Sequence, residues 1–269
     1  MQQLADDILA RYARQTNYAP LGREGQERLG RSRVAVIGAG GLGSALCDQL
    51  CRAGVGYLRL VDDDRVELVN LHRQHLYTEE DAAAGELKAT AAARHVGRIN
   101  SQVRVEPVVA RVSAGNVLEL IDGVDLVLDG TDNWPTRFCL NDACVKRRTP
   151  WIFAGVVAGE AVTMNILPGR TPCLRCVYDE PPPPGASPTC KEVGVLGPAV
   201  QMIAAVQAFE AIKFLSGRSE AMSRSLTRFD LWTNRIQQID LAAAAAGLDC
   251  PCCKQGRYDF LAPSARNQE

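Results

Sequence analysis

A glycine-rich turn between a short apolar strand and a helix is the feature that most constrains this sequence. Residues 33–43 read RVAVIGAGGLG, and the next apolar stretch ends in three aspartates at 62–64. This order predicts a nucleotide-binding βαβ unit, in which glycines let the backbone approach phosphate and the amides opening the helix attract an anion. The predicted nucleotide-binding glycines are Gly38, Gly40, Gly41 and Gly43. The pattern also suits an NAD-binding enzyme or a ligand-free connection between a strand and a helix.

Alternation of strands and helices continues beyond this unit. We expect a helix over 86–99, a strand over 103–109, a short helix over 116–121 and a strand over 124–129. This order predicts an α/β fold with a doubly wound, mostly parallel Rossmann-like sheet. Shorter strands follow at 151–156, 160–168, 225–232 and 235–240, with an apolar helix over 198–215. We expect these strands to continue the sheet, the last two in antiparallel order.

Neither a repeat nor a clear linker divides the 269 residues, so we expect a single domain over 1–269. Its parts are an N-terminal helical arm (1–30), a nucleotide-binding half (31–150) and a second half (151–269). The second half contains a loop over 177–194 with four consecutive prolines at 181–184. Such a run excludes a helix and favours an extended, exposed path.

Composition is that of a globular protein. The chain is 46% hydrophobic and its net charge is −1, so bulk electrostatics indicate neither a nucleic-acid partner nor a membrane partner. We identify no apolar run of membrane-spanning length, and the polar N-terminus lacks the core of a signal peptide. We therefore expect a cytoplasmic protein.

Ten cysteines in a chain of this kind favour metal binding or thiol chemistry over disulfides. Two C-x-x-C pairs have the spacing of a closed, four-thiolate Zn²⁺ site that ties the C-terminal segment to the middle of the chain. The predicted ligands are Cys173, Cys176, Cys250 and Cys253. Cys252 would be an alternative ligand, and reduced loop cysteines are the alternative to a metal site. We expect Cys47, Cys51, Cys139 and Cys144 to be small core residues.

Several motifs, in one order along nearly the whole chain, resemble the ThiF/MoeB/HesA family, the bacterial relatives of ubiquitin-activating enzymes. They are RYARQ (11–15), GAGGLGS (38–44), AGVGYLRLVDDDRVELVNLHRQ (53–74), GELKA (85–89), DGTDN (129–133), PCLRC (172–176), TCKEVGVLGP (189–198) and CPCC (250–253). The resemblance implies a homodimer that uses ATP and Mg²⁺. Its implied reaction is adenylation of the C-terminal glycine carboxylate of a small ubiquitin-like sulfur-carrier protein ending in Gly-Gly, with release of pyrophosphate.

The resemblance also assigns roles to residues of this chain. Arg73 and Lys88 would line the triphosphate, and Arg14 would reach in from the partner subunit. The remaining implied site residues are Asn70 and Gln74 beside the phosphates, Asp62 or Asp64 at the ribose, and Asp132 as the ligand of Mg²⁺. Fixed cations suit this chemistry because negative charge builds on the transferring phosphoryl group and on the departing pyrophosphate.

Ordinary structural roles are alternatives for these residues. Arg14 and Lys88 would otherwise be solvated helix-surface charges, and Asp62 would stabilise a turn. Asp132 would otherwise cap a helix that starts near Trp134. Cys190, in the loop before GVLGP, matches the place where some relatives carry a reactive thiol, and its thiolate fraction would be a few per cent at neutral pH unless Lys191 or a helix N-terminus lowers its pKa.

Two other functions remain open from sequence alone. An NAD-dependent oxidoreductase would use the glycine turn and Asp62 but leaves the three cations without a purpose. A noncatalytic zinc-stabilised scaffold would keep only the fold. The chain leaves no room for a sulfurtransferase domain after the second cysteine pair, so we expect a separate sulfur donor protein. The carrier and the pathway, for example thiamine or molybdopterin biosynthesis, are not identified by the sequence.

Overall fold

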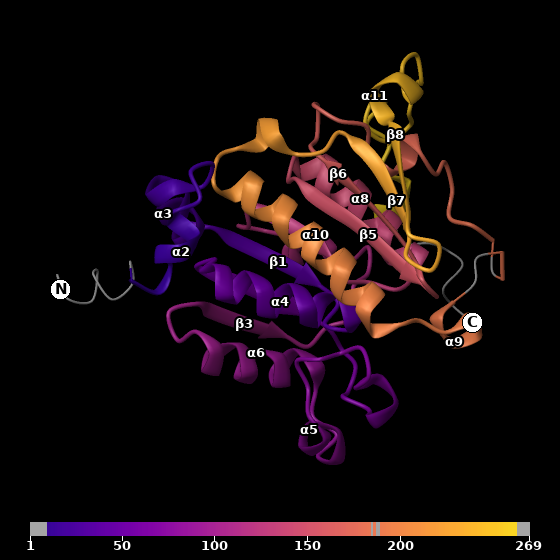
Figure 1. Cartoon of the computed structure of the whole chain (residues 1–269). Helices are drawn as coiled ribbons and strands as arrows, with labels where there is room; N and C mark the ends of the chain where they lie inside the picture. The colour runs from indigo at the N-terminus through magenta and orange to yellow at the C-terminus, as the bar shows by residue number, and fades with distance from the viewer. Residues whose placement is uncertain (1–9, 184, 187–188, 263–269) are drawn as a thin grey trace.

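One eight-stranded sheet runs through the computed structural model (Figure 1). The structure describes residues 10–183, 185–186 and 189–262. The strand order is β3-β2-β1-β4-β5-β6-β7-β8. The strands are β1 (Arg33–Ile37), β2 (Tyr57–Val61), β3 (Arg104–Val108), β4 (Leu126–Asp129), β5 (Trp151–Val157), β6 (Glu160–Ile166), β7 (Ser225–Asp230) and β8 (Arg235–Asp240). Pairing is parallel from β3 to β5 and antiparallel from β5 to β8, which confirms the predicted fold class.

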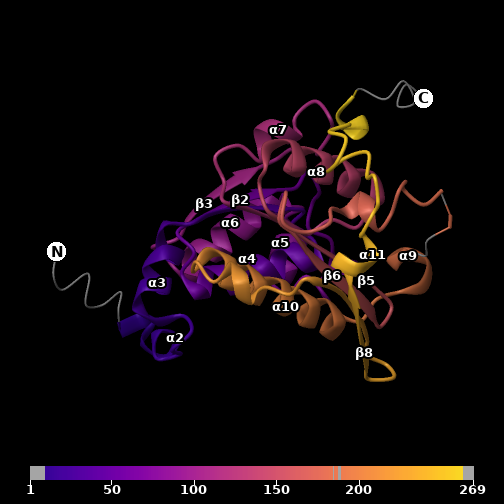
Figure 2. The same ribbon diagram turned by 90° about the horizontal axis from the view of Figure 1, so that it is seen from above.

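Helices cover both faces of the sheet (Figure 2). Helices α4 (Gly41–Ala53), α6 (Lys88–Ile99) and α10 (Gly197–Leu215) pack on one face. On the other lie α7 (Val117–Leu120) and α8 (Trp134–Arg147). The shorter helices are α2 (Ala13–Thr16), α3 (Gly22–Arg31), α5 (Glu79–Ala83), α9 (Cys190–Val193), α11 (Leu241–Ala244) and the 3-10 turns η1 (Leu68–Asn70), η2 (Leu174–Cys176), η3 (Ser219–Ala221) and η4 (Asp259–Leu261).

Element boundaries differ from the sequence-based predictions by one to a few residues. The helix predicted over 86–99 begins at Lys88, and the strand predicted over 124–129 begins at Leu126. Part of the predicted N-terminal arm (residues 1–9) and residues 184, 187 and 188 of the proline-rich loop lie outside the described residues.

Helix α10 corrects one expectation. At 19 residues it is long and apolar enough to pass for a membrane span, although we identified no such run in the sequence. The helix packs against α4, β5 and β6, and about half of its apolar window is buried inside the protein. Its apolar surface is therefore that of a core helix covering the sheet.

Candidate nucleotide site and zinc site

The glycine turn lies at the carboxyl end of β1, where two backbone segments touch. Gly38 has a φ of +89°, and a Cβ on it would lie 2.6 Å from the carbonyl oxygen of Gly130 after β4. A Cβ on Gly43 would lie 1.8 Å from the carbonyl oxygen of Gly38. These two glycines are therefore required for packing between β1, α4 and the end of β4.

Gly40 and Gly41 form the open side of the turn. A Cβ on Gly40 would meet only the Nε2 atom of Gln74, at 3.7 Å. Helix α4 begins directly after Gly40 without a side-chain cap, so its first amides have no intrahelical partner. Gln74 is buried, and its Oε1 atom has no hydrogen-bond partner in the described part of the chain. The free backbone amides of α4 are donors that suit a bound phosphate, and the Nε2 group of Gln74 is a further donor beside the open backbone.

Lys88 and the aspartates after β2 meet beside this turn. The Nζ atom of Lys88 lies 2.7 Å from Oδ2 of Asp64, and the lysine is only 5% exposed, so the alternative of a solvated lysine is wrong. Asp62 accepts the amide N–H groups of Ala39, at 2.6 Å, and of Asp64, at 2.8 Å. Burial raises the pKa of the Asp62 carboxyl, and the nearby Lys88 opposes that rise. Asp62 thus stabilises the turn, as its alternative role predicts, and still has unused lone pairs for a ribose hydroxyl.

Tyr77, which the sequence analysis missed, joins the two sides of this corner. Its buried hydroxyl lies 2.6 Å from the carbonyl oxygen of Ala39 in the glycine turn and 3.2 Å from that of Lys88 at the start of α6. The hydroxyl has a single proton, so it donates to one of these two carbonyl oxygens at a time. In the sequence, the only signal for Tyr77 was its position between the motifs at 53–74 and 85–89.

Arg73 lies beside Gly41 of the turn. Its Nη2 atom donates to Oδ1 of Asn70 at 2.8 Å, and its Nη1 atom donates to Nε2 of His72 at 2.9 Å. A Cβ on Gly41 would lie 3.7 Å from Cγ of Arg73. The arginine stem therefore packs against the start of α4, while two acceptors orient its guanidinium group.

Asp132 follows β4 and is exposed, with one long contact of 3.4 Å from Nδ2 of Asn133. The helix cap that was the alternative role of Asp132 belongs to Asn133, whose Oδ1 accepts the Thr136 amide N–H at 3.0 Å. The alternative role of Asp132 as a cap is therefore wrong. Its carboxylate remains available as an oxygen ligand for a hard cation such as Mg²⁺.

Behind Asp132 lies a buried ion pair that the sequence analysis did not identify. Arg137 of α8 donates to Oδ2 of Asp129 at 3.1 Å and to the carbonyl oxygens of Thr131 and Ala154 at 2.8 and 3.1 Å. These bonds tie α8 to the ends of β4 and β5. The arginine thus fixes the strand ends that carry the Asp132 segment.

Cys190 begins α9 near these charges. Its half-buried Sγ atom lies 3.5 Å from the carbonyl oxygen of Val156 in β5. Burial raises the pKa of this thiol, Arg73 and Arg137 act to lower it, and Asp132 acts to raise it. The net rise lowers the thiolate fraction at neutral pH, so the structure does not provide the activation that a reactive thiol requires. The charges that act on Cys190 include Arg73 and Asp132, so this cysteine lies near the candidate nucleotide site.

Arg14 is the one predicted cation that lies away from the site of its own chain. The neighbouring Gln15 donates from Nε2 to the carbonyl oxygen of Ala53, the last residue of α4, at 2.9 Å. The glycine turn adjoins the other end of this 13-residue helix, roughly 20 Å away. Figure 1 likewise shows α2 and α3 at one end of the sheet and α9 at the other. Arg14 is exposed at that end of α4, as the alternative role of a solvated surface charge predicts.

The four predicted zinc ligands come together on the α8 face. Sγ atoms are 3.9 Å apart for Cys173 and Cys176, 3.7 Å for Cys173 and Cys250, and 3.4 Å for Cys176 and Cys253, and all four lie within 4.8 Å of one another. A tetrahedral Zn²⁺ with bonds of about 2.3 Å separates its sulfur ligands by about 3.8 Å. The residues therefore fit Zn²⁺. Cys252 lies outside this group, and its Sγ atom accepts from Nδ2 of Asn141 at 3.4 Å.

Comparison with known proteins identifies the family of this chain. The model of the ThiF family matches residues 12–252. The chain belongs to the ThiF family.

Relatives of known name are similar over most of the chain. It is 42% identical to the sulfur carrier protein ThiS adenylyltransferase of Bacillus subtilis, over 97% of this chain and 76% of that protein. It is 40% identical to the sulfur carrier protein adenylyltransferase of Thermus thermophilus, over 91% of this chain and 90% of that protein. Among solved structures, E. coli MccB with MccA-N7isoASN superposes with a TM-score of 0.77 at 25% identity, over 86% of this chain and 72% of that one.

Proposed function

We propose that this member of the ThiF family adenylates the C-terminal glycine carboxylate of a small ubiquitin-like sulfur-carrier protein, consuming ATP and releasing pyrophosphate. One observation carries the proposal. Two cations, the buried Lys88 and the oriented Arg73, flank a glycine turn whose helix amides are free. The names of the relatives in Bacillus subtilis and Thermus thermophilus support the same reaction and the same class of carrier.

The proposed roles follow from the charge changes of the reaction. The incoming carboxylate and the α-phosphate are both anions, and pyrophosphate departs with additional negative charge. Arg73 and Lys88 would offset this charge along the triphosphate, while the free amides of α4 and the Nε2 group of Gln74 would donate to phosphate oxygens. Asp62 would accept a ribose hydroxyl. Because Asp64 already accepts from Lys88, we assign it to orienting the lysine.

Asp132 is the proposed magnesium ligand. Its exposed carboxylate follows the end of β4, beside the glycine turn that touches Gly130. Mg²⁺ prefers one or two carboxylates together with phosphate oxygens and water, so a single aspartate at the mouth of a phosphate site suits it. When bound, the ion would neutralise charge on the triphosphate.

The active unit is proposed to be a homodimer. Arg14 lies at the far end of α4 from its own glycine turn, so it serves the reaction only if it enters the site of a second copy. The carrier would approach over the 177–194 loop, whose described part brings Cys190 near Arg73 and Asp132. A separate protein would then supply sulfur to the adenylate. The cytoplasm, which keeps zinc-binding thiols reduced, is the proposed setting.

Exchange of labelled pyrophosphate into ATP tests this function directly. Exchange that requires Mg²⁺ and a carrier ending in Gly-Gly, with a carrier adenylate detected by intact mass, is the expected result. A carrier lacking its last glycine is the matched control, because the reacting carboxylate is then displaced from the α-phosphate. Tight binding of NADH with no ATP binding would reject the proposal in favour of an oxidoreductase.

A further inference from the structure

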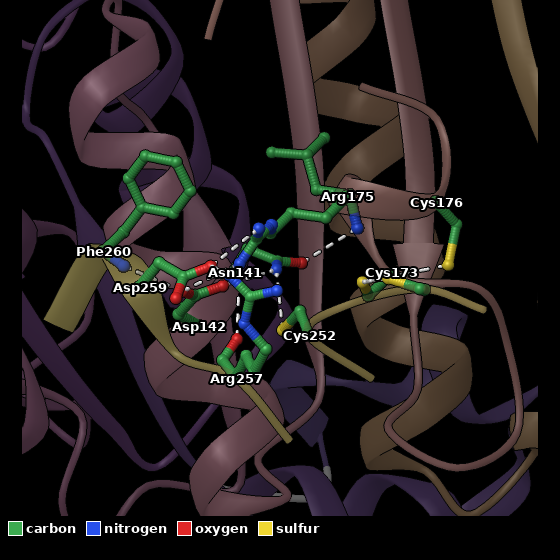
Figure 3. Close-up of polar contacts among 11 residues, drawn as sticks. Asn141, Asp142, Cys173, Arg175, Cys176, Cys252, Arg257, Asp259 and Phe260 are labelled. Carbon is green, nitrogen blue, oxygen red and sulfur yellow. Dashed lines mark hydrogen bonds and ion pairs between the residues drawn. The ribbon is translucent and has the colours of Figure 1, made fainter. Parts of the chain in front are cut away.

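A buried asparagine joins the two cysteine pairs of the zinc site from helix α8 (Figure 3). Asn141 is fully buried. Its Oδ1 atom accepts the amide N–H of Leu174, between the ligands Cys173 and Cys176, at 2.8 Å. Its Nδ2 atom donates to Sγ of Cys252, between Cys250 and Cys253, at 3.4 Å. One side chain therefore contacts both C-x-x-C segments, which lie far apart in the sequence.

The next residue of α8 extends this connection. Asp142 is fully buried, and its Oδ2 atom accepts the Phe260 amide N–H at 3.1 Å. The same carboxylate lies 3.6 Å from Arg175 of η2, which also donates to Asp259 at 3.1 Å. The contact from Asn141 to the Cys252 thiol and these contacts of Asp142 together link α8 to the segment around η4 and to both cysteine pairs.

The four cysteines of the candidate metal site differ in how far they are buried. Cys173 and Cys250 are buried, whereas Cys176 and Cys253 are half-buried. A cavity of about 340 Å³, lined by Cys176, Arg228 and Ile239 among others, opens beside the half-buried side. The α8 contacts reach the backbone of the first cysteine pair and the Cys252 side chain of the second, whereas the cavity adjoins the half-buried Cys176.

We propose that Asn141 is the positioning residue of the zinc site, holding the two C-x-x-C segments at the separation that a tetrahedral ion requires. Each segment alone is a short turn, and closing the long loop between them costs conformational entropy. A buried amide that uses one acceptor and one donor on the two segments fixes their spacing before the ion binds. This inference concerns metal retention and holds or fails independently of adenylation.

Outer-shell contacts of this kind typically change metal affinity by about 10- to 100-fold when removed. The full-length zinc protein should therefore release Zn²⁺ to a chromogenic chelator about 10-fold faster, or more, after Asn141→Leu. Leucine keeps the volume and removes the hydrogen bonds to both cysteine segments, together with the 3.2 Å bond from Nδ2 to Oδ1 of Asp142. Cys252→Ala, which breaks only the link to the second segment, should give a smaller increase in the release rate.

Asn165→Leu is the matched control. Asn165 is also a buried asparagine with two hydrogen bonds, from Nδ2 to Oε2 of Glu210 at 2.7 Å and to the carbonyl oxygen of Ser223 at 3.0 Å. It should destabilise the fold without changing zinc release. Equal release from Asn165→Leu and Asn141→Leu, or wild-type release from Asn141→Leu, would overturn the proposal. If Asn141→Leu does not fold, a wild-type release rate for Cys252→Ala overturns it.

Discussion

In the candidate nucleotide site, the buried Lys88 forms an ion pair with the exposed Asp64. The side chain of Lys88 is 6% exposed, whereas that of Asp64, its ion-pair partner, is 68% exposed. Water already solvates the carboxylate, so the pair contributes little to stability. The burial of the lysine instead strengthens its interaction with any anion that enters the site, because the local dielectric constant is low. Lys88 is thus better explained by ligand binding than by folding.

Replacing Lys88 with methionine tests this explanation. Lys88→Met keeps most of the apolar stem, so the free energy of unfolding should change by less than about 1 kcal/mol. Carrier-dependent pyrophosphate exchange should fall by about 10²- to 10³-fold, as when one preorganised transition-state contact is removed. Lys146→Met, at an exposed position on α8, should leave exchange unchanged. Full exchange in Lys88→Met would instead show that Lys88 does not stabilise the transition state of the reaction.

At the scale of elements, a buried carboxylate joins α5 to α6 near the start of the helix that carries Lys88. Asp81 caps α5 with Thr78 in a reciprocal pair of hydrogen bonds. Its carboxylate also pairs with Arg94 and lies 2.7 Å from Nε2 of His95, both on α6. Burial raises the pKa of Asp81, but hydrogen bonds from the Thr78 amide, His95 and Arg94 outweigh it and hold the pKa well below the usual range. The charged form therefore stabilises the fold.

The free energy of unfolding should depend on pH because of the Asp81 carboxylate. A lowered folded-state pKa contributes stability that is complete above the unfolded pKa of about 3.9 and is lost as the pH falls toward the folded value. Asp81→Asn should cost about 1–3 kcal/mol at pH 7, and the difference from wild type should shrink below about pH 4. Urea unfolding in a His95→Gln background isolates the carboxylate from the imidazole. A difference that does not vary with pH would contradict the assignment.

For the whole molecule, the proposed homodimer would make the active site depend on two copies of the chain, because Arg14 lies away from the glycine turn of its own chain. Inactive Arg14→Ala and Lys88→Met chains should complement one another when mixed. A mixed dimer has one site with wild-type Lys88 and an Arg14 from its partner, and a second site lacking both. Random mixing makes about half of the dimers mixed, so exchange should recover to about a quarter of the wild-type value in a twofold symmetric dimer.

Each variant alone should remain inactive, which provides the control for this mixture. Unfolding and refolding the two chains together allows the subunits to exchange. If Arg14 acted on its own chain, both sites of the mixed dimer would be defective and the mixture would stay inactive. If Arg14 were only a surface charge, Arg14→Ala would be active before mixing.

The sequence by itself determined the order of strands and helices, the glycine turn and the four cysteines that come together as a candidate metal site, because these depend on local periodicity and on short spacings. The strand and helix predictions around Lys88 and Asp132 were wrong only at their boundaries. The resemblance to the ThiF/MoeB/HesA family pointed to Arg73 and Asn70, which lie three residues apart and hydrogen-bond each other.

Only the tertiary structure decided which contacts form between distant segments. It distinguished Cys252 from the zinc ligands, assigned the cap of α8 to Asn133 in place of Asp132, and raised the pKa of Cys190 by burying it. It also revealed Tyr77 and Asn141, each of which joins segments that the sequence separates. Burial and hydrogen-bond partners depend on how the elements pack, and local spacing carries little information about that packing.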